Sequence, residues 1–435
     1  MSTPVWKWLS RVFGFRLQGN EQRDNPKRCP GRSGHTSVCI GENLLVWGGY
    51  RDDEHSPYQD ERYLSPMEIW VYNADMDCWT SRKCTVPEGD SLTPVGTSGA
   101  CSVLILPYWY IVGGHTGFGN INHVWRLNVQ TFEWEFVRTS EPGLSPRDKF
   151  TAWAYEQRIY CFGGFGIHPR GSGLHNHGVF IEDETEMAGF NRGWNNQLLI
   201  LDTVSFEWLN PKCHGPLPSA RAAHSAVLLG DKVYIFGGRH GVHRLNDLHC
   251  LDLKSLTWSG ELNAAGPLPE GRSWHTMSDI GDNRLLLFGG FSQDQRPLDD
   301  VWLLDMAHLQ WTLLSPGNGH PRLWHTASVT SSGTVLVFGG CKNNILSPQH
   351  RSRFSGSVIK FEVQPKRLDR LCMHAVFRHR KKTRAEWELL PVEMQKWLAE
   401  KKQVEKELRN LRGKISYSGF TNVSLSGSQR PDEGS

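Results

Sequence analysis

An apolar run that ends in a Gly-Gly doublet recurs six times along the chain, and this repeat constrains the fold more than any other feature. Successive doublets lie 65, 50, 74, 52 and 50 residues apart. Internal periods of about 20–50 residues are typical of repeat architectures. A length of 435 residues predicts roughly two or three domains, or one repeat architecture that exceeds the usual size of a single domain. The runs are LLVWGG (Gly48, Gly49), WYIVGG (Gly113, Gly114), IYCFGG (Gly163, Gly164), VYIFGG (Gly237, Gly238), LLLFGG (Gly289, Gly290) and VLVFGG (Gly339, Gly340).

Two further motifs follow the same repeat. After each of the first five doublets, an aromatic residue or Leu stands seven residues before a Trp, as in Tyr72 and Trp79. Before four of the doublets stands Arg-x-x-His, at Arg32, Arg221, Arg272 and Arg322. Together these motifs match the kelch repeat, which folds as four antiparallel strands per blade. The sequence therefore predicts an all-β fold, a six-bladed kelch β-propeller over residues 29–365, followed by a short C-terminal α-helical adaptor segment.

Each motif has a physical role in such a propeller. Paired glycines let the second strand turn sharply without a Cβ clash where the blades crowd the central channel. The Trp and the residue seven positions earlier fill the wedge between neighbouring blades. We interpret the repeated His, each with its own Arg, as structural polar links within each blade. We therefore expect no metal site and no cofactor.

Two irregularities interrupt the repeat. The longest interval contains an insertion from Ile167 to Arg192, which we expect to form a loop or lid on one face. In the sixth repeat, Leu368 takes the place of Trp seven residues after Phe361, which predicts that the outer strand is missing or altered. Residues 1–28 form a leader with three interpretations: a strand that completes the last blade, a disordered segment, or a basic amphipathic helix on a membrane surface.

Charge is distributed unevenly. Residues 366–414 carry 15 Lys/Arg and 7 Asp/Glu, a local charge of +8, while the rest of the chain has 33 Lys/Arg and 38 Asp/Glu, a charge of −5. A mildly acidic body argues against nucleic acid as a partner, because phosphate binding needs a clustered basic face. No apolar run approaches the roughly 20 residues of a spanning helix, so no membrane partner is expected.

The ten cysteines include no Cys-x-x-Cys pair. Their spacing therefore indicates neither a zinc finger nor a redox motif. Reduced thiols are the simplest interpretation, and they favour a cytoplasmic or nuclear location, or both.

The residues directly after the doublets indicate a binding site, because loops that leave the same strand of every blade converge on one face. Arg239 follows the fourth doublet and Arg244 stands five residues later, while the next repeat opens with Ser273. Two guanidinium groups and a hydroxyl brought together form a site for a carboxylate. Charge pattern alone leaves a second interpretation open: solvated loop arginines, or arginines paired with Asp247.

Most of the chain, residues 30–400, resembles the family of kelch domain-containing proteins 1 and 2, substrate receptors of cullin-2 RING ubiquitin ligases. The resemblance rests on the runs RSGH, VWGGY, SGAC, PRDK, GGFG, GWN, PSARAAH, FGGR, RLNDLHCLDL, GRSWHT, PRLWHTA and FGGCKNN. It implies a deep propeller pocket that receives the extreme C-terminus of a substrate protein and favours terminal Gly-Gly. Phe165 stands where better-studied members have Tyr, so the exact C-terminal preference stays open. By the same resemblance, the carboxylate anchors are Arg239, Arg244 and Ser273, and the pocket wall includes Tyr50, Lys149, Trp194, Trp274 and Trp324.

Residues 366–400 resemble the adaptor-binding part of these receptors. Leu368, Cys372 and Val376 recur at i, i+4 and i+8, near one helix face, and are similar to the elongin-binding box. The cullin-2 box is matched by Leu390, Pro391, Met394 and Leu398. Either match alone also fits a helix that packs on the propeller. The implied partners are elongin B/C, cullin-2 and its RING subunit.

The last part of the chain, residues 401–435, is predicted to be a charged helix followed by a disordered Ser/Gly-rich tail. The basic run from Arg378 to Arg384 is either a nuclear import signal or a solvated linker. The tail ends in Gly434 and Ser435, small residues on a flexible tether. We hypothesise that this end occupies the pocket of its own or a neighbouring copy, giving self-association.

We therefore expect a non-catalytic substrate receptor of a cullin-2 RING E3 ubiquitin ligase, which binds C-degrons and leads to ubiquitination and degradation of their proteins. One alternative is a kelch scaffold that binds internal segments or cytoskeletal proteins without a ligase. Kelch-type propellers also include enzymes, but nothing in this sequence singles out a catalytic set.

Overall fold

The structure, a computed structural model, describes residues 28–51, 63–89, 92–168, 179–184, 191–347, 349–363, 368–392, 394–399 and 401–402. This part of the chain divides into two compact units, one beginning at Cys29 and the other at Leu368. Apart from Arg28, the predicted leader lies outside the described residues, as do residues 403–435 with the Gly434–Ser435 end.

The first unit consists of antiparallel sheets, which confirms the all-β prediction. Six of them each hold one Gly-Gly doublet, within or directly after the second strand. The first three are β1 (Thr36–Ile40), β2 (Asn43–Trp47), β3 (Glu68–Asn73), β4 (Cys78–Lys83); β5 (Cys101–Ile105), β6 (Tyr108–Thr116), β7 (Gly119–Asn128), β8 (Glu133–Val137); and β10 (Thr151–Tyr155), β11 (Arg158–Phe162), β15 (Leu198–Asp202), β16 (Trp208–Leu209). The other three are β17 (Ser225–Leu229), β18 (Lys232–His240), β19 (His243–Asp252), β20 (Thr257–Glu261); β21 (Arg272–Ser273) and β22 (Thr276–Asp279) on β23 (Arg284–Ser292), then β24 (Pro297–Asp305), β25 (Gln310–Ser315); and β26 (Thr326–Val329), β27 (Thr334–Phe338), β28 (Val358–Glu362).

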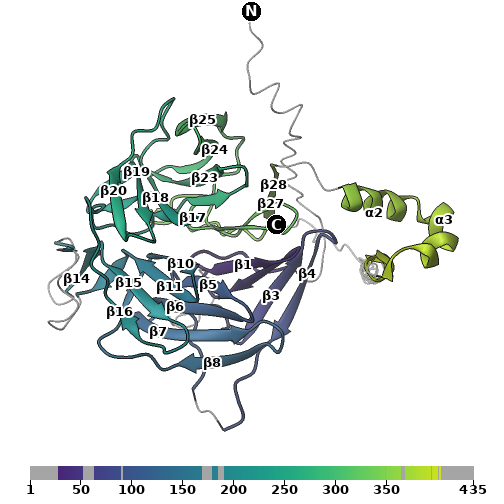
Figure 1. The fold of residues 1–435 in the computed structure, drawn as a ribbon, viewed down its shortest axis with the longest axis horizontal. Helices are drawn as coiled ribbons and strands as arrows, with labels where there is room; N and C mark the ends of the chain where they lie inside the picture. Colours follow the sequence, from purple (N-terminus) through teal and green to yellow (C-terminus); the bar gives the residue numbers. More distant parts are fainter. Residues whose placement is uncertain are drawn as a thin grey trace, which may run out of the picture. The chain divides into compact units, whose positions relative to one another are not determined.

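The innermost strands close a ring. β1 contacts β5, β5 contacts β10, β10 contacts β17, β17 contacts β22, β22 contacts β26, and β26 returns to β1. Figure 1 shows β1, β5, β10 and β17 around a common centre. A channel of about 250 Å³ runs between the six inner strands. Because the ring is closed, the inner strand of the last sheet packs beside the inner strand of the first.

The glycine doublets turn the chain as the sequence predicts. In all six doublets both glycines have positive φ, between 63° and 109°. At Gly238 a Cβ atom would lie 2.8 Å from the His224 Cβ and 2.9 Å from the Ala222 carbonyl oxygen. Positive φ and this close approach both require glycine.

The aromatic residues fill the space between neighbouring sheets, as predicted. Trp134 of the second sheet packs against Trp47 of the first, with 5.5 Å between ring centroids. Equivalent pairs are Trp258 with Phe162 at 5.0 Å, Trp311 with Phe236 at 5.2 Å, and Trp79 with Phe338 of the last sheet at 4.8 Å. In the last sheet, which lacks the Trp, Phe361 packs on Phe288 at 5.2 Å. Five of the six sheets therefore contact the aromatic residue that precedes the doublet of a neighbouring sheet, while Trp208 of the third sheet packs in a cluster with Val112, the residue before the second doublet.

In the Arg-x-x-His motifs, the Arg bonds within its own sheet, but the His does not. Arg221 and Arg272 bind Asp247 and Asp300 of their own sheets through both terminal nitrogens, at 2.7 Å. Three of the four histidines instead reach the adjacent sheet: His35 bonds with Thr326 at 2.9 Å, His224 with Thr151 at 2.8 Å and His325 with Thr276 at 2.9 Å. For these three, the interpretation of the His as links within a blade is therefore wrong, because a ring nitrogen bonds to a Thr of the neighbouring inner strand.

The described residues of the insertion include strand residues, where we expected a loop or lid. Its described residues supply β13 (Phe180–Glu182) and the start of β14 (Arg192–Asn195), which join β12 (Phe165–Ile167) and β9 (Arg147–Asp148) in the sheet order β13-β14-β12-β9. Residues 169–178 and 185–190 lie outside the described part. The insertion therefore adds a small sheet beside the third repeat.

The last of the six sheets has three strands in the described part of the chain, in keeping with a missing or altered outer strand. Cys29 is buried among residues of this sheet, including Leu336 and Phe338. None of the ten cysteines is bonded to another.

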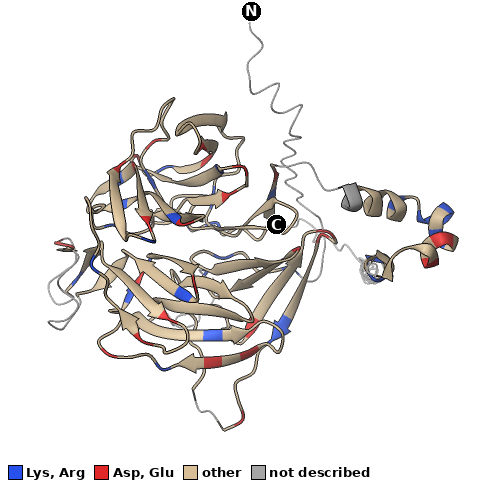
Figure 2. Cartoon of the chain, in the orientation of Figure 1, with Lys and Arg blue, Asp and Glu red and all other residues tan. Residues whose placement is uncertain are grey.

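The second unit is helical. It contains α2 (Leu368–Arg378), α3 (Arg380–Thr383), the 3-10 turn η2 (Arg384–Leu389) and further helical residues 394–399. Figure 2 shows the basic residues of α3 in blue beside acidic residues in red. Among the described residues, no helix is long and apolar enough to cross a membrane.

Candidate functional site

A ring of backbone hydrogen bonds lies where the six inner strands begin. One residue from each sheet has φ between 55° and 65°, and its N–H donates to the carbonyl of the equivalent residue in the preceding sheet at 2.7–3.2 Å. In the Arg-x-x-His motifs this is the third residue, directly before the His that lines the channel. The six residues are Gly34, Gly99, Lys149, Ala223, Trp274 and Trp324.

A cavity of about 290 Å³ opens at this ring. Eight of the nine residues that the sequence predicts for substrate binding line it, and the ninth, Arg244, lies beside it. The eight are Tyr50, Lys149, Phe165, Trp194, Arg239, Ser273, Trp274 and Trp324.

The two arginines are cross-strand partners. Arg239 on β18 lies opposite Arg244 on β19. Arg239 Nε donates to the Gly241 carbonyl at 2.8 Å, and Arg244 Nε donates to Ser273 Oγ at 3.3 Å. Burial and the charge of Arg239 lower the pKa of Arg244 to about 10, so the Arg244 side chain remains charged at neutral pH. The arrangement concentrates two positive charges and a hydroxyl at one end of the cavity.

The interpretation that these arginines pair with Asp247 does not hold. Asp247 accepts two hydrogen bonds from Arg221 at 2.7 Å and one from His249 at 2.8 Å. Within the described ranges, no carboxylate lies at ion-pair distance from Arg239 or Arg244. A carboxylate from another molecule would therefore meet two positive charges that no described carboxylate neutralises.

The neighbouring sheet holds Arg244 in place through contacts that no sequence motif indicates. Gln293 accepts a hydrogen bond from the Arg244 backbone N–H at 2.7 Å and donates one to the Val242 carbonyl at 3.2 Å. A Cβ on Gly271 would lie 2.2 Å from the Arg244 carbonyl oxygen. The Arg244 guanidinium carbon lies 4.6 Å from the centroid of the Phe291 ring. The Gln293 and Gly271 contacts hold the Arg244 backbone, while Ser273 and Phe291 orient its side chain before any ligand arrives, which lowers the entropy lost on binding.

Aromatic rings form the walls of the cavity. Trp274 and Trp324 stack with 5.2 Å between centroids and 19° between planes, and Tyr50 meets Trp324 edge-on at 5.6 Å. In the same cavity, Phe165 packs on Trp194 at 5.0 Å. Five aromatic rings therefore make up a large part of the cavity lining.

Some lining residues were missed in the sequence. Arg192 and Asp183 come from the insertion, where no repeat equivalent marks a position, and Ile345 and Leu346 follow the last doublet. Ala223 could have been found, because it is the third residue of an Arg-x-x-His motif. The Arg192 guanidinium carbon lies 4.7 Å from the Phe165 ring centroid, so the insertion supplies another cation to the site.

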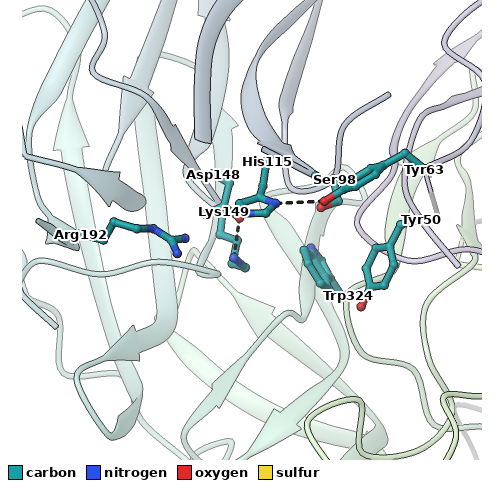
Figure 3. A pocket seen from close by; sticks show the side chains of 9 residues that line it. Tyr50, Tyr63, Ser98, His115, Asp148, Lys149, Arg192 and Trp324 are labelled. Atoms are coloured by element: carbon teal, nitrogen blue, oxygen red, sulfur yellow. Dashed lines mark hydrogen bonds and ion pairs between the residues drawn. The ribbon is translucent and has the colours of Figure 1, made fainter. Parts of the chain in front are cut away.

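A second cavity of about 320 Å³ adjoins the first. The two share Tyr50, Lys149, Arg192 and Trp324. Figure 3 shows the second cavity, to which Tyr63, Ser98, His115 and Asp148 also contribute.

In the helical unit, the residues predicted for partner binding are distributed between surface and core. Cys372 and Pro391 are exposed, and the side chain of Leu368 is not among those described. Leu398 is fully buried with Met373 and Phe377, and the partly buried Val376, Leu390 and Met394 pack against this cluster. Met394 N–H donates to the Pro391 carbonyl at 2.9 Å, so Pro391 opens a helical turn, the position where its missing N–H costs nothing. Leu398 stabilises the unit from within, while Cys372 and Pro391 lie on its surface.

Comparison with known proteins identifies the repeat. Residues 34–189 and 187–340 match the KLHDC2/KLHL20/DRC7 Kelch-repeats domain family. Human Kelch domain-containing protein 2 is 38% identical over 83% of this chain and 89% of its own length. Human Kelch domain-containing protein 1 is 36% identical over 83% of this chain and 87% of its own length. Kelch domain-containing protein 10 of Xenopus tropicalis is 26% identical over 86% of this chain. The predicted kelch repeat and its propeller fold are therefore confirmed.

Proposed function

Because this chain belongs to the family of Kelch domain-containing proteins 2 and 1, we propose that it is the substrate receptor of a cullin-2 RING ubiquitin ligase. In this role the propeller binds the C-terminus of a substrate protein, favouring Gly-Gly ends. The helical unit binds elongin B/C and cullin-2, and a RING subunit brings the ubiquitin-charged enzyme. The chain itself performs no chemistry and contributes proximity.

The observation that carries the proposal is the pair Arg239 and Arg244 with Ser273, at one end of an aromatic cavity. Planar guanidinium groups match a carboxylate with two parallel hydrogen bonds. An internal Gly-Gly brings no carboxylate to this end, so the site distinguishes the end of a chain from its interior. The walls formed by Trp194, Trp274 and Trp324 disfavour residues with larger side chains, and selectivity then arises partly by exclusion.

The Gly434–Ser435 end of the chain is, on this proposal, a competitor for the same cavity. Its tether raises its effective concentration near the propeller, in its own molecule or in a neighbouring copy. Self-association through this end accordingly belongs to the proposed function.

The ligase half of the proposal predicts a loss of elongin C binding. The double variant Leu368→Ala with Cys372→Ala removes the apolar contacts of the elongin box, so elongin C and cullin-2 are expected to be lost from affinity-purified full-length protein. Quantitative immunoblotting of the purified complexes measures this. The matched control is Leu371→Ala on the same helix, since Leu371 is 49% exposed and lies outside the box.

Equal recovery of elongin C with both variants would contradict the elongin-box assignment. If the wild-type protein itself recovers no elongin C, the chain is a kelch scaffold without a ligase.

A further inference from the structure

We propose that the second cavity binds an acidic side chain that lies upstream, in the same polypeptide whose C-terminus occupies the first cavity. The inference rests on the proposed function and adds a substrate class to it: proteins that end in Gly-Gly and carry Asp or Glu a few residues earlier.

The two cavities adjoin, because they share four lining residues. Lys149 and Arg192 line both of them, and so do Tyr50 and Trp324. A chain anchored at Arg239 and Arg244 must leave the first cavity past these shared walls or toward solvent. Extending along the shared walls brings its upstream residues directly into the second cavity.

The second cavity is rich in hydrogen-bond donors. Tyr50, Tyr63 and Ser98 bring hydroxyl groups, and His115 Nδ1 lies 3.0 Å from the Tyr63 hydroxyl oxygen. Burial lowers the pKa of His115, so the ring is neutral at pH 7. When the Tyr63 hydroxyl donates to His115 Nδ1, the neutral imidazole carries its hydrogen on Nε2, which is a second donor. Carboxylate oxygens are the acceptors that such donors bind most strongly.

The charges of the described lining residues also favour an anion. Asp148 is the acidic member; its side chain is 1% exposed and lies 2.5 Å from Lys149 Nζ, so its charge is matched. Arg192 adds a further cation, giving a net charge of +1 for Lys149, Arg192 and Asp148. Figure 3 shows Arg192 and Lys149 reaching into the same space, with Tyr50 and Trp324 across from them. Asp183 lines only the first cavity. A lysine in the second cavity would meet two cations and is disfavoured.

The test is a peptide series on the full-length protein. Peptides of otherwise uncharged sequence end in Gly-Gly and carry a single Glu, Gln or Lys at each of the third to sixth positions from the end. Calorimetry or fluorescence anisotropy gives the dissociation constants. At one or two of these positions Glu is expected to bind about 5–10-fold more tightly than Gln, with Lys weaker than Gln.

Variants of Arg192 locate the effect. The Glu-to-Gln affinity ratio is expected to fall to about 1 in Arg192→Gln and to be largely kept in Arg192→Lys, which retains the charge. Because the ratio is taken within each variant, a general loss of affinity cancels. Equal affinity for Glu and Gln at every position would overturn the inference. A C-terminal amide version of the best peptide distinguishes failure of this inference from failure of the proposed function. If only the inference fails, amidation still weakens binding.

Discussion

Replacing Arg244 with Gln is expected to weaken binding of a Gly-Gly-ended peptide by about 30-fold to several thousand-fold. Removing one charged partner of a half-buried carboxylate costs about 2–5 kcal/mol, and each 1.4 kcal/mol is a factor of ten in affinity. The Arg244→Lys variant keeps the charge but loses the planar fork, so it is expected to bind with intermediate affinity. Fluorescence anisotropy with a labelled peptide measures all three proteins.

The Arg244→Gln variant is expected to be as stable as the wild type, so its loss of peptide affinity can be distinguished from a loss of folding. In the described part of the chain Arg244 pairs with no carboxylate, and its charge lies beside that of Arg239. The Arg244→Gln variant is therefore expected to unfold at the same or slightly higher denaturant concentration than the wild type. Arg82→Gln on the outer strand β4 is the matched control, because Arg82 is exposed. Loss of peptide affinity in both variants would contradict the assignment of Arg244.

Acidification from pH 7.5 to pH 5 is expected to destabilise the propeller by about 4 kcal/mol through two channel histidines. Burial lowers the pKa of His224 and of His325 to about 3, against about 6.5 in the unfolded chain. The unfolded state therefore binds more protons below pH 6.5. The contribution of each histidine to the free energy of unfolding is fully present above that pH. It falls by about 2 kcal/mol per histidine by pH 5 and continues to fall toward pH 3. His35 and His275 shift in the same direction for the same first cause, burial.

Urea unfolding at several pH values, followed by tryptophan fluorescence, measures this dependence. The His224→Gln variant removes one titrating group and is expected to show a shallower fall between pH 6.5 and pH 5, whatever its stability at pH 7.5. Asp247 does not contribute to the fall between pH 6.5 and pH 5. Its bonds to His249 and Arg221 lower its pKa, so its contribution to the free energy of unfolding is lost only below the ordinary carboxylate range. An unfolding free energy that is equal at pH 7.5 and pH 5 would show that these histidines are not buried as neutral groups.

Much of the fold could be predicted because each repeat carries the residues that its geometry requires. The doublet Gly237 and Gly238 marks a turn with positive φ that other residues resist. Trp258 marks the contact with Phe162 of the preceding sheet. The direction of the His224 bond could not be predicted, because repeat spacing does not say whether a polar side chain faces its own sheet or the next one.

The repeat defines only part of the site. Arg239 could be placed because it directly follows a doublet, whereas Trp194 and Trp274 were predicted from the resemblance to kelch domain-containing proteins 1 and 2. Arg192 belongs to the insertion, which has no counterpart in the other repeats to define its register. Gln293 holds Arg244 through a contact between two hairpins, which depends on how neighbouring sheets are rotated. The burial of Leu398 likewise follows from the packing of several short helices rather than from its spacing.

The most direct test compares one Gly-Gly-ended peptide with the same peptide carrying a C-terminal amide, both titrated into the full-length wild-type protein. Amidation removes the negative charge and one acceptor oxygen but leaves the sequence and length unchanged. If Arg239, Arg244 and Ser273 hold a terminal carboxylate, the amide is expected to bind at least about 30-fold more weakly. Equal affinities for the acid and the amide would contradict the central claim, since the cavity would then recognise some other feature of the peptide.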